Sequence, residues 1–520
     1  MRLFGQTLAL PRALCQELLN GVAQGRLSDK QRAEVVRHKG QTTSAILTHH
    51  LFLGRYCIST DMYSFKRYKP HYSRILRLAM PVVLAQAGQL TTQFADTAMV
   101  GQFGGDNPIP LAAVSLGSSL FLLIYLAVLG LALGITPIVG ESYARNDRRE
   151  VSRIFANGIL YCLLLGVGAT IAAIAMRPFI GVLQGWMSSS GGDVEAVAEM
   201  ALPYYDMLVW SIVPMTLFLA VKQFLEGIGN TKVAMWTTLG GNVLNIGLNY
   251  ILIFGHCGVE AMGAEGAGLA TLISRIVQTI AIACYFFFSF RMRIYRSLFE
   301  RGSLAASYLK RLLSIGFPIS FQMVLESAAF ILTSILALSF GAAASSAMQV
   351  SFNIANIAWM ITVAIGSAST IVVSHIYGAQ QRSELRPTIY ATYHLGLVWA
   401  LFMATLFVVL RNNIGALFTD NTETIALTAQ LMLPIAIYQL SDSIQGLSIS
   451  MLRGIQDVKI IMPIVLCSYL ILNIPIGCML AYHFQMGCMG LVIGLIIGLS
   501  SAAILTALRL RNQTKRFELK

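Results

Sequence analysis

The chain alternates long apolar runs with short polar segments over most of its length. A run of about 20 predominantly apolar residues is long enough to cross a bilayer as a helix. The pattern therefore predicts an all-α membrane protein with twelve transmembrane helices and no soluble domain of useful length. The twelve apolar runs lie near residues 76–100, 111–140, 154–176, 203–226, 233–254, 264–290, 312–340, 346–377, 388–410, 426–452, 458–481 and 487–508.

Composition and charge distribution agree with this pattern. Of the 520 residues, 56% are hydrophobic and 12% are charged, whereas an average soluble domain has about 25% charged residues. The net charge of +13 does not indicate a nucleic-acid partner, because the basic residues gather in alternate loops, as in cytoplasmic loops of membrane proteins. Both termini are therefore expected in the cytoplasm. The basic segments are residues 66–77, 145–153, 291–311 and 509–516.

Residues 1–61 differ from the rest of the chain, since they are polar and lack an apolar core long enough for a signal peptide. We expect this segment to be a non-native or disordered extension, caused by a start codon assigned upstream of Met62. A regulatory tail or a transit peptide is the alternative. The remaining chain is predicted to form an N-terminal six-helix bundle with a connecting cytoplasmic loop (62–300), a C-terminal six-helix bundle (301–511) and a cytoplasmic tail (512–520).

An internal repeat relates the first six apolar runs to the last six. With six spans in each half, both halves start on the same side of the membrane. The repeat thus predicts two bundles related by a pseudo-twofold axis along the membrane normal, the parallel-repeat plan of many secondary transporters. The matching segments are Ala79–Pro81 with Gly316–Pro318 (offset 237), Pro137–Glu150 with Thr370–Glu384 (offset 234) and Leu225–Val233 with Leu452–Ile460 (offset 227).

Three acidic residues interrupt apolar runs: Asp96, Glu326 and Asp442. A charged side chain at the centre of a bilayer costs about 2.5 to 3.5 kcal/mol on insertion scales, and such residues commonly serve ion or substrate pathways. These acids predict a transporter. The eight cysteines are scattered without CxxC spacing, so neither a disulfide framework nor a tightly bound metal is expected.

Several sequence elements resemble the multidrug and toxic compound extrusion (MATE) family, most closely its NorM-like bacterial branch. The resemblance covers about Tyr72–Arg511 and implies an exporter that exchanges H⁺ or Na⁺ for cationic amphiphilic drugs by alternating access. It also implies a monomer in the bacterial inner membrane, with no cofactor apart from the coupling ion. Besides Glu326, the matching elements are FADTAMVGQFG (94–104), EGIGNTK (226–232), LNIGLNYILIFG (244–255), YQLSDSIQ (438–445) and MLRGIQD (451–457).

The resemblance implies two polar sites. Glu326, Tyr438 and Asp442 match the cation-binding cluster of the C-terminal half, while Asp96, Asn245 and Asn249 match a polar cluster of the N-terminal half. The i,i+4 spacings agree with this assignment, because Tyr438 and Asp442 share a helix face, as do Asn245 and Asn249. The two asparagines could thus present carbonyl oxygens toward Asp96.

Comparison of corresponding positions in the two halves shows that the three acids are not duplicated. By the local offsets, Glu326 corresponds to Gln89, Asp442 to Met215 and Asp96 to Thr333. We therefore expect different cation or substrate roles in the two halves.

Structural roles for the same residues stay open. Glu326 and Asp442 could be anchored by Arg275, and Asp96 could cap its helix. Asn245 and Asn249 could bind backbone groups across helices. Tyr438 could have a packing role alone.

Other functions are less well supported by the sequence. A lipid-linked oligosaccharide flippase should line its cavity with basic residues, and only Lys222 and Arg275 qualify. An intramembrane aspartyl protease would need a GxGD motif, and an ATP-driven pump a Walker motif. Neither motif is found, so we do not expect an enzyme.

Neutral oxygen atoms near the acids (Tyr438, Ser441, Gln445) favour Na⁺ over H⁺ as the coupling ion.

Overall fold

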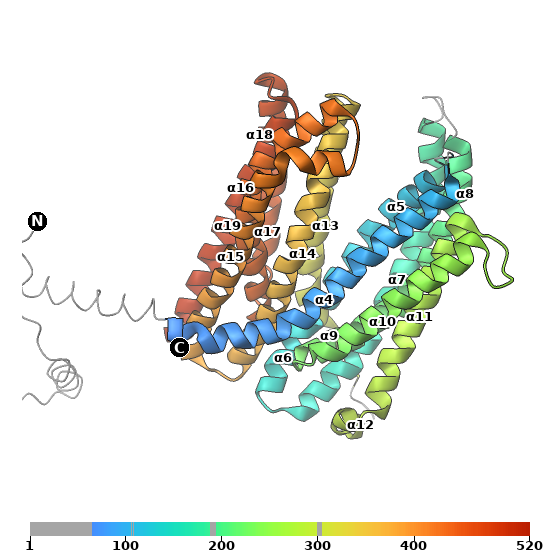
Figure 1. Ribbon diagram of the computed structural model, residues 1–520. Coiled ribbons are helices and arrows are strands. Elements are labelled where there is room, and N and C mark those ends of the chain that lie inside the picture. Colours follow the sequence, from blue (N-terminus) through green and yellow to red (C-terminus); the bar gives the residue numbers. More distant parts are fainter. Residues whose placement is uncertain (1–64, 106, 108, 188–193, 299–303, 520) are drawn as a thin grey trace, which may run out of the picture. The chain divides into compact units, whose positions relative to one another are not determined.

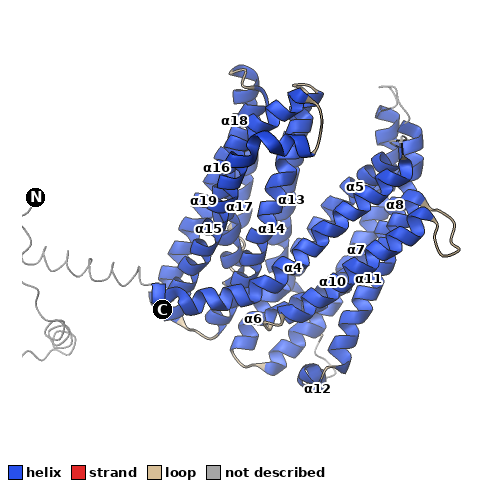
Figure 2. Cartoon of the chain, viewed as in Figure 1, coloured by secondary structure: helices blue, strands red, loops and turns tan. Residues whose placement is uncertain are grey.

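The computed structural model describes residues 65–105, 107, 109–187, 194–298 and 304–519. Residues 68–520 form one unit, to which the following description applies. Within the described residues all regular structure is helical (Figure 2). The predicted extension, 1–61, lies outside them, and its nature stays a prediction.

Six spans form the N-terminal half, here called the N lobe. The second and fourth spans are each divided into two consecutive helices. A short 3-10 turn, η2 (Phe290–Met292), and α12 (Arg293–Ser297) follow the sixth span. The spans are α4 (Phe65–Gly104), α5 (Ile109–Leu133) with α6 (Ile135–Ala144), α7 (Arg148–Met187), α8 (Val194–Trp210) with α9 (Ile212–Gly227), α10 (Thr231–Phe254) and α11 (Gly263–Phe288).

The C-terminal half, the C lobe, repeats this plan with six further spans. Its fifth span contains two π-helical segments, and the first of them precedes Pro475. In a regular α-helix the proline ring would clash with the carbonyl group four residues earlier. The spans are α13 (Ala306–Leu338), α14 (Ala342–Gly378), α15 (Arg382–Ile414) with η3 (Gly415–Leu417), α16 (Thr422–Gly454), α17 (Ile461–Leu466) with η4 (Cys467–Asn473), α18 (Ile474–Cys478) and η5 (Met479–His483), and α19 (Gly487–Leu519).

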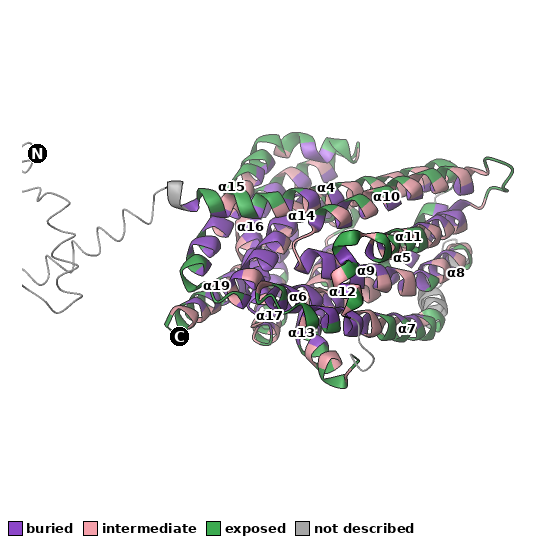
Figure 3. Ribbon diagram, turned by 90° about the horizontal axis from the view of Figure 1, so that it is seen from below, coloured by how far each residue is buried: buried purple, intermediate pink, exposed green. Residues whose placement is uncertain are grey.

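The twelve-span, two-bundle prediction is confirmed. Ten spans are long and apolar enough to cross a membrane by themselves; α4 and α10 are the other two, and they carry the polar residues Asp96, Asn245 and Asn249. Large apolar side chains such as Trp236 and Val409 are exposed, as expected on faces that contact lipid. Figure 3 shows exposed positions along the outer faces of helices such as α7 and α10.

Corresponding hydrogen bonds make the repeat visible in three dimensions. In the N lobe the Thr136 hydroxyl donates to the carbonyl of Gln223 at 3.1 Å. In the C lobe Thr370 donates to the carbonyl of Ser450 at 2.7 Å. The two donors are related by the offset 234 and the two acceptors by the offset 227, as in the sequence comparison.

Two corresponding glycines make the same close approach. A Cβ atom added to Gly227 would lie 2.7 Å from Cγ1 of Val139, and one added to Gly454 would lie 2.8 Å from Cγ1 of Val373. Since real Cβ atoms essentially never come this close, both positions require glycine for helix packing.

The lobes touch where α5 crosses α13, through small residues spaced by four. A Cβ atom on Gly130 would lie 2.4 Å from Cα of Ser320, and one on Gly134 would lie 2.9 Å from the backbone nitrogen of Gly316. Small residues at i and i+4 let two helix backbones approach closely without lipid between them. The Ser320 hydroxyl also donates to the carbonyl of Ala127 at 2.8 Å.

Inter-lobe polar contacts gather toward one end of the bundles. They join α6 and α7 to α13 and the residue before it, α6 to the turn after α16, the end of α9 to α14, and the start of α4 to α15. In Figure 1 these ends of the helices lie at the bottom, and the two sets of helices are farther apart at the top. Among the described residues, no inter-lobe hydrogen bond is found at the opposite ends.

Candidate cation and substrate sites

The C-lobe residues predicted to bind a cation lie together in the structure. Helix α16 provides Tyr438 and Asp442, which are only 6% and 3% exposed, and α13 provides Glu326. The side chains of these three residues interact electrostatically with one another. Helical spacing explains the α16 pair, because residues four apart lie on one face.

Glu326 is surrounded by neutral hydrogen-bond donors. Its Oε2 accepts from Nε2 of Gln322 at 2.6 Å. Its Oε1 accepts from the hydroxyl of Tyr469 at 2.9 Å and, more weakly, from Nε2 of Gln445 at 3.5 Å. Tyr469 belongs to the π-helical segment η4, and π-helical turns are frequent at functional sites. Both oxygens of this carboxylate therefore already have partners.

Asp442 differs from Glu326, since its Oδ2 is buried and has no hydrogen-bond partner. The Tyr438 hydroxyl lies near the same carboxylate. The Arg453 guanidinium interacts electrostatically with Glu326 and can compensate one negative charge. A second ionised carboxylate in this shielded site is costly unless a cation or a proton compensates its charge. The available donor atoms are hard oxygens, which suit Na⁺, and Asp442 has an oxygen free to bind one.

Arg453 and Gln322 belong to this cluster and were not predicted. The Arg453 guanidinium donates to Oε1 of Gln322 at 2.6 Å, and Gln322 in turn donates to Glu326. Gln322 could have been found from its position one helical turn before Glu326. Arg453 was harder to find, because it ends an apolar run beside a polar turn.

The structure does not support two possibilities that the sequence left open. Arg275 does not anchor the C-lobe acids; it lies in the N lobe, where it donates to the hydroxyl of Ser211 at 2.6 Å and stacks 5.0 Å above the ring centre of Phe121. Ser441 does not face Asp442, because its hydroxyl bonds with that of Ser500 on α19 at 2.8 Å. Adjacent residues of a helix do not share a face, which explains the separation of Ser441 from Asp442.

The N-lobe residues also come together, between α4 and α10. Nδ2 of Asn249 donates to Oδ1 of Asp96 and lies 3.4 Å from Oδ1 of Asn245. The amide of Asn249 thus offers its NH₂ group to the carboxylate, and not the carbonyl oxygen that the sequence suggested. Its Oδ1 is buried without a partner. Asp96 does not cap its helix, which continues to Gly104.

Tyr204 links this cluster to Arg275, since it interacts electrostatically with both Asp96 and Arg275. The N-lobe site therefore combines one carboxylate with amides, a phenol and a guanidinium. Within the described ranges, no group of three or more His, Cys, Asp or Glu side chains is arranged to hold a metal ion.

Comparison with known proteins decides the family. The MatE family model matches two segments of the chain, residues 81–251 and 318–479. The segments begin 237 residues apart (318 − 81), which is the offset of the first repeat pair in the sequence. The chain belongs to the MATE family. Members of this family are transporters, and this MATE protein is accordingly a multi-pass membrane transporter.

Relatives agree in sequence and in fold. The multidrug resistance protein NorM of Vibrio vulnificus (strain CMCP6) is 31% identical over 452 residues, which cover 85% of this chain and 96% of NorM. The eukaryotic MATE transporter AtDTX14 superposes with a TM-score of 0.76 at 18% identity, covering 87% of this chain and 99% of AtDTX14. An outward-facing multidrug resistance MATE transporter of the MOP superfamily gives 0.76 at 21% identity, covering 86% and 97%.

Proposed function

We propose that this MATE protein is a cation-coupled multidrug antiporter. It exports cationic amphiphilic compounds across the inner membrane by alternating access, with Na⁺ or H⁺ as the coupling ion. The observation that carries the proposal is the pair of neighbouring carboxylates Glu326 and Asp442, in which Oδ2 of the buried Asp442 has no partner. The resemblance to a protein named for multidrug resistance supports the choice of substrate class.

The coupling ion acts by compensating the charge of the two carboxylates. Each elementary charge that moves down the membrane potential yields about 2.3 kcal/mol per 100 mV, which is enough to drive substantial drug accumulation outside. Export also requires the cation and the drug to prefer different conformations, since a ligand shifts an equilibrium only by its differential affinity.

The inter-lobe contacts support a conformation closed toward the cytoplasm. They lie at the helix ends beside the basic segments 145–153 and 291–311, which the positive-inside pattern assigns to the cytoplasm. The coupling ion would then reach Asp442 from the opposite side. We assign both termini to the cytoplasm on the same charge pattern and expect a monomer without nucleic-acid partners.

The N-lobe cluster of Asp96, Asn245 and Asn249 is proposed as a second polar site, for substrate or cation. Its single carboxylate can attract an organic cation, and the partner-free Oδ1 of Asn249 can accept a hydrogen bond from it. The flippase alternative is not favoured, because the basic residues in the spans are engaged by other groups. Arg275 binds Ser211 and Phe121, and Lys222 lies 3.9 Å from Glu226.

Separate ion gradients test the proposal. Proteoliposomes containing the full chain are preloaded with a cationic dye, and dye release is followed after adding NaCl or after an acid pulse in constant choline chloride. We expect release on adding NaCl, because neutral oxygens of Tyr438 and Gln445 lie close to the two carboxylates. Release on the acid pulse alone reassigns Glu326 and Asp442 as proton carriers.

The antiporter proposal would be contradicted if neither NaCl nor the acid pulse released the dye. Transport of a fluorescent lipid-linked oligosaccharide in the same vesicles would then support the flippase.

A further inference from the structure

Gln456, in the turn after α16, stands where the first repeat has Gly229 (456 − 227). Both residues have positive φ angles, 62° for Gln456 and 84° for Gly229. Glycine adopts this left-handed conformation freely, whereas a residue with a side chain does so only at a free-energy cost. Such strained positions often have a function, which directs attention to what the Gln456 side chain does.

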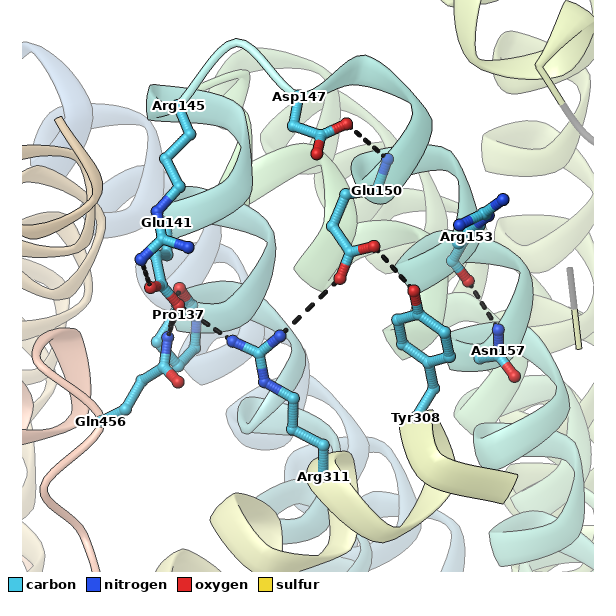
Figure 4. Close-up of polar contacts among 10 residues, drawn as sticks. All are labelled: Pro137, Glu141, Arg145, Asp147, Glu150, Arg153, Asn157, Tyr308, Arg311 and Gln456. Atoms are coloured by element: carbon cyan, nitrogen blue, oxygen red, sulfur yellow. Dashed lines mark hydrogen bonds and ion pairs between the residues drawn. The ribbon is translucent and has the colours of Figure 1, made fainter. Parts of the chain in front are cut away.

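The Gln456 side chain reaches into the other lobe. Its Nε2 donates to Oε2 of Glu141 on α6 at 2.6 Å. Glu141 is buried, 6% exposed, and also binds Arg145 of its own lobe and, at 2.9 Å, Arg311 of α13. Figure 4 shows the two C-lobe side chains, Gln456 and Arg311, converging on this carboxylate. Glu141 is thus a point at which the lobes are held together, here called the Glu141 contact.

The same turn is connected to the cation site. Arg453, three residues before Gln456, donates to Oε1 of Gln322 at 2.6 Å, and Nε2 of Gln322 donates to Glu326 at 2.6 Å. The Glu326 carboxylate and the Glu141 contact are therefore joined by one short path of hydrogen bonds and one turn of backbone. Helix α13 spans the same interval, because it carries Arg311 as well as Gln322 and Glu326.

The amide of Gln322 makes this path sensitive to the ion. An amide has one oxygen and one NH₂ group. While Arg453 holds the oxygen, the NH₂ group must face Glu326. A metal ion on Glu326 needs oxygen ligands and is repelled by that NH₂ group. A proton on Oε2 of Glu326 likewise displaces the NH₂ group of Gln322, which donates to that oxygen. Either ion therefore competes with the bond between Gln322 and Arg453.

We propose that Gln322, Arg453 and Gln456 are positioning residues that link cation binding at Glu326 to release of the Glu141 contact. Cation binding weakens the hold of Gln322 on Arg453, the turn that carries Gln456 shifts, and the lobes part on the cytoplasmic side. This inference rests on the proposed cation site. By linkage the effect is reciprocal, so weakening the Glu141 contact must tighten cation binding.

Gln456→Gly tests the reciprocal effect without touching the cation site or changing its charge. The full chain in detergent is titrated with NaCl at constant pH and, separately, with acid at constant NaCl, and the midpoint of thermal stabilisation is recorded. We expect Gln456→Gly to lower the cation concentration at the midpoint about five-fold, the lower end of typical coupling. Gln456→Asn, which tolerates the left-handed backbone but has a shorter side chain, should act in the same direction.

Gln380→Gly is the matched control. Gln380 has the equivalent strained backbone, with φ 56°, in the turn after α14, but its side-chain amide bonds, among the residues that the structure describes, only with the carbonyl of Tyr377 in the same turn, at 3.1 Å. The control relieves the same kind of strain and leaves the Glu141 contact intact. We expect its cation midpoint to equal that of the unmodified protein.

Arg453→Lys tests the other end of the path while keeping the charge, because lysine lacks the reach and fork geometry of the guanidinium. It should also tighten cation binding several-fold. Combined with Gln456→Gly, the effect should be no larger than that of the stronger single variant, because both interrupt one path.

Spin labels replace the exposed residues Arg149 and Arg511 in a background without native cysteines. The distance between the labels should depend on the cation in the unmodified protein. Both variants should make this distance independent of the cation.

Distinct results separate this inference from the proposed function. If the unmodified protein shows no cation response, or Glu326→Gln keeps it, the cation site itself is wrong and the inference fails with it. If the response is present and depends on Glu326, but Gln456→Gly matches Gln380→Gly or adds independently to Arg453→Lys, only the link is refuted.

Discussion

The two lobes use the same scaffold for different polar chemistry. In the C lobe, the half-buried Glu326 and the buried Asp442 lie together with tyrosines and amides. In the N lobe, Asp96 stands alone among the carboxylates of its cluster, is only partly buried and is held by Asn249. The positions that correspond to the C-lobe acids hold Gln89 and Met215.

This difference between the acidic residues of the two lobes indicates that the repeat keeps its helix packing, whereas its charged sites differ. The conserved part is visible in the hydrogen bonds of Thr136 and Thr370, which keep corresponding partners. A paired-carboxylate site favours a small ion that can be fully enclosed, whereas a single carboxylate with larger neighbours suits an organic cation. The following predictions test that division of roles.

Neutralising either C-lobe acid should have the largest effect. We expect Glu326→Gln and Asp442→Asn each to reduce coupled dye efflux by about 100-fold or more, because removing one member of a buried charge cluster changes its energetics by several kcal/mol. Folding should be preserved, since each amide has nearly the size and shape of the carboxylate that it replaces. Efflux is measured in everted vesicles at matched expression.

The control for this pair is Met215→Leu, at the position that corresponds to Asp442 in the other lobe. It should retain nearly normal efflux. Full resistance to cationic dyes in either acid variant would exclude that residue from the cation site.

Disturbing the shared packing between the lobes should have an intermediate effect. In Gly130→Ala the new Cβ atom would collide with Cα of Ser320, at 2.4 Å. Overpacking of this kind costs about 1 to 3 kcal/mol, so we expect the conformation with these lobe contacts to lose that much stability and efflux to fall roughly ten-fold. The inter-lobe spin-label distance should increase.

Gly168→Ala is the comparison, because nothing lies within 4 Å of an added Cβ atom there. Equal behaviour of the two alanine variants would show that close contact between α5 and α13 is not needed for transport.

Asp96→Asn should have the smallest effect and the most selective one. It removes one charge from a partly exposed site, which is expected to weaken drug binding by about 1 kcal/mol, or roughly five-fold. The cation midpoint of thermal stabilisation should stay unchanged. A shifted cation midpoint with unaltered drug affinity would reverse the roles assigned to the two lobes.

Much of the site could be predicted from the sequence because its members stand out in apolar runs. Asp442 and Tyr438 share a helix face by spacing alone, and Glu326 is conspicuous in α13. Tyr469 could not be found in this way, since aromatic residues are common in transmembrane helices and its contact with Glu326 depends on the π-helical turn of η4. Similarly, the orientation of the Asn249 amide depends on its neighbours on α4.

The sequence by itself determined the membrane location, the twelve spans and the twofold repeat, because these follow from hydropathy and from patterns repeated along the chain. Only the tertiary structure decided which residues meet across the repeat. Arg453 reaches Gln322 and Gln456 reaches Glu141 over sequence separations of 131 and 315 residues. Such contacts depend on how helices cross and rotate against each other, and local spacing contains no information about that geometry.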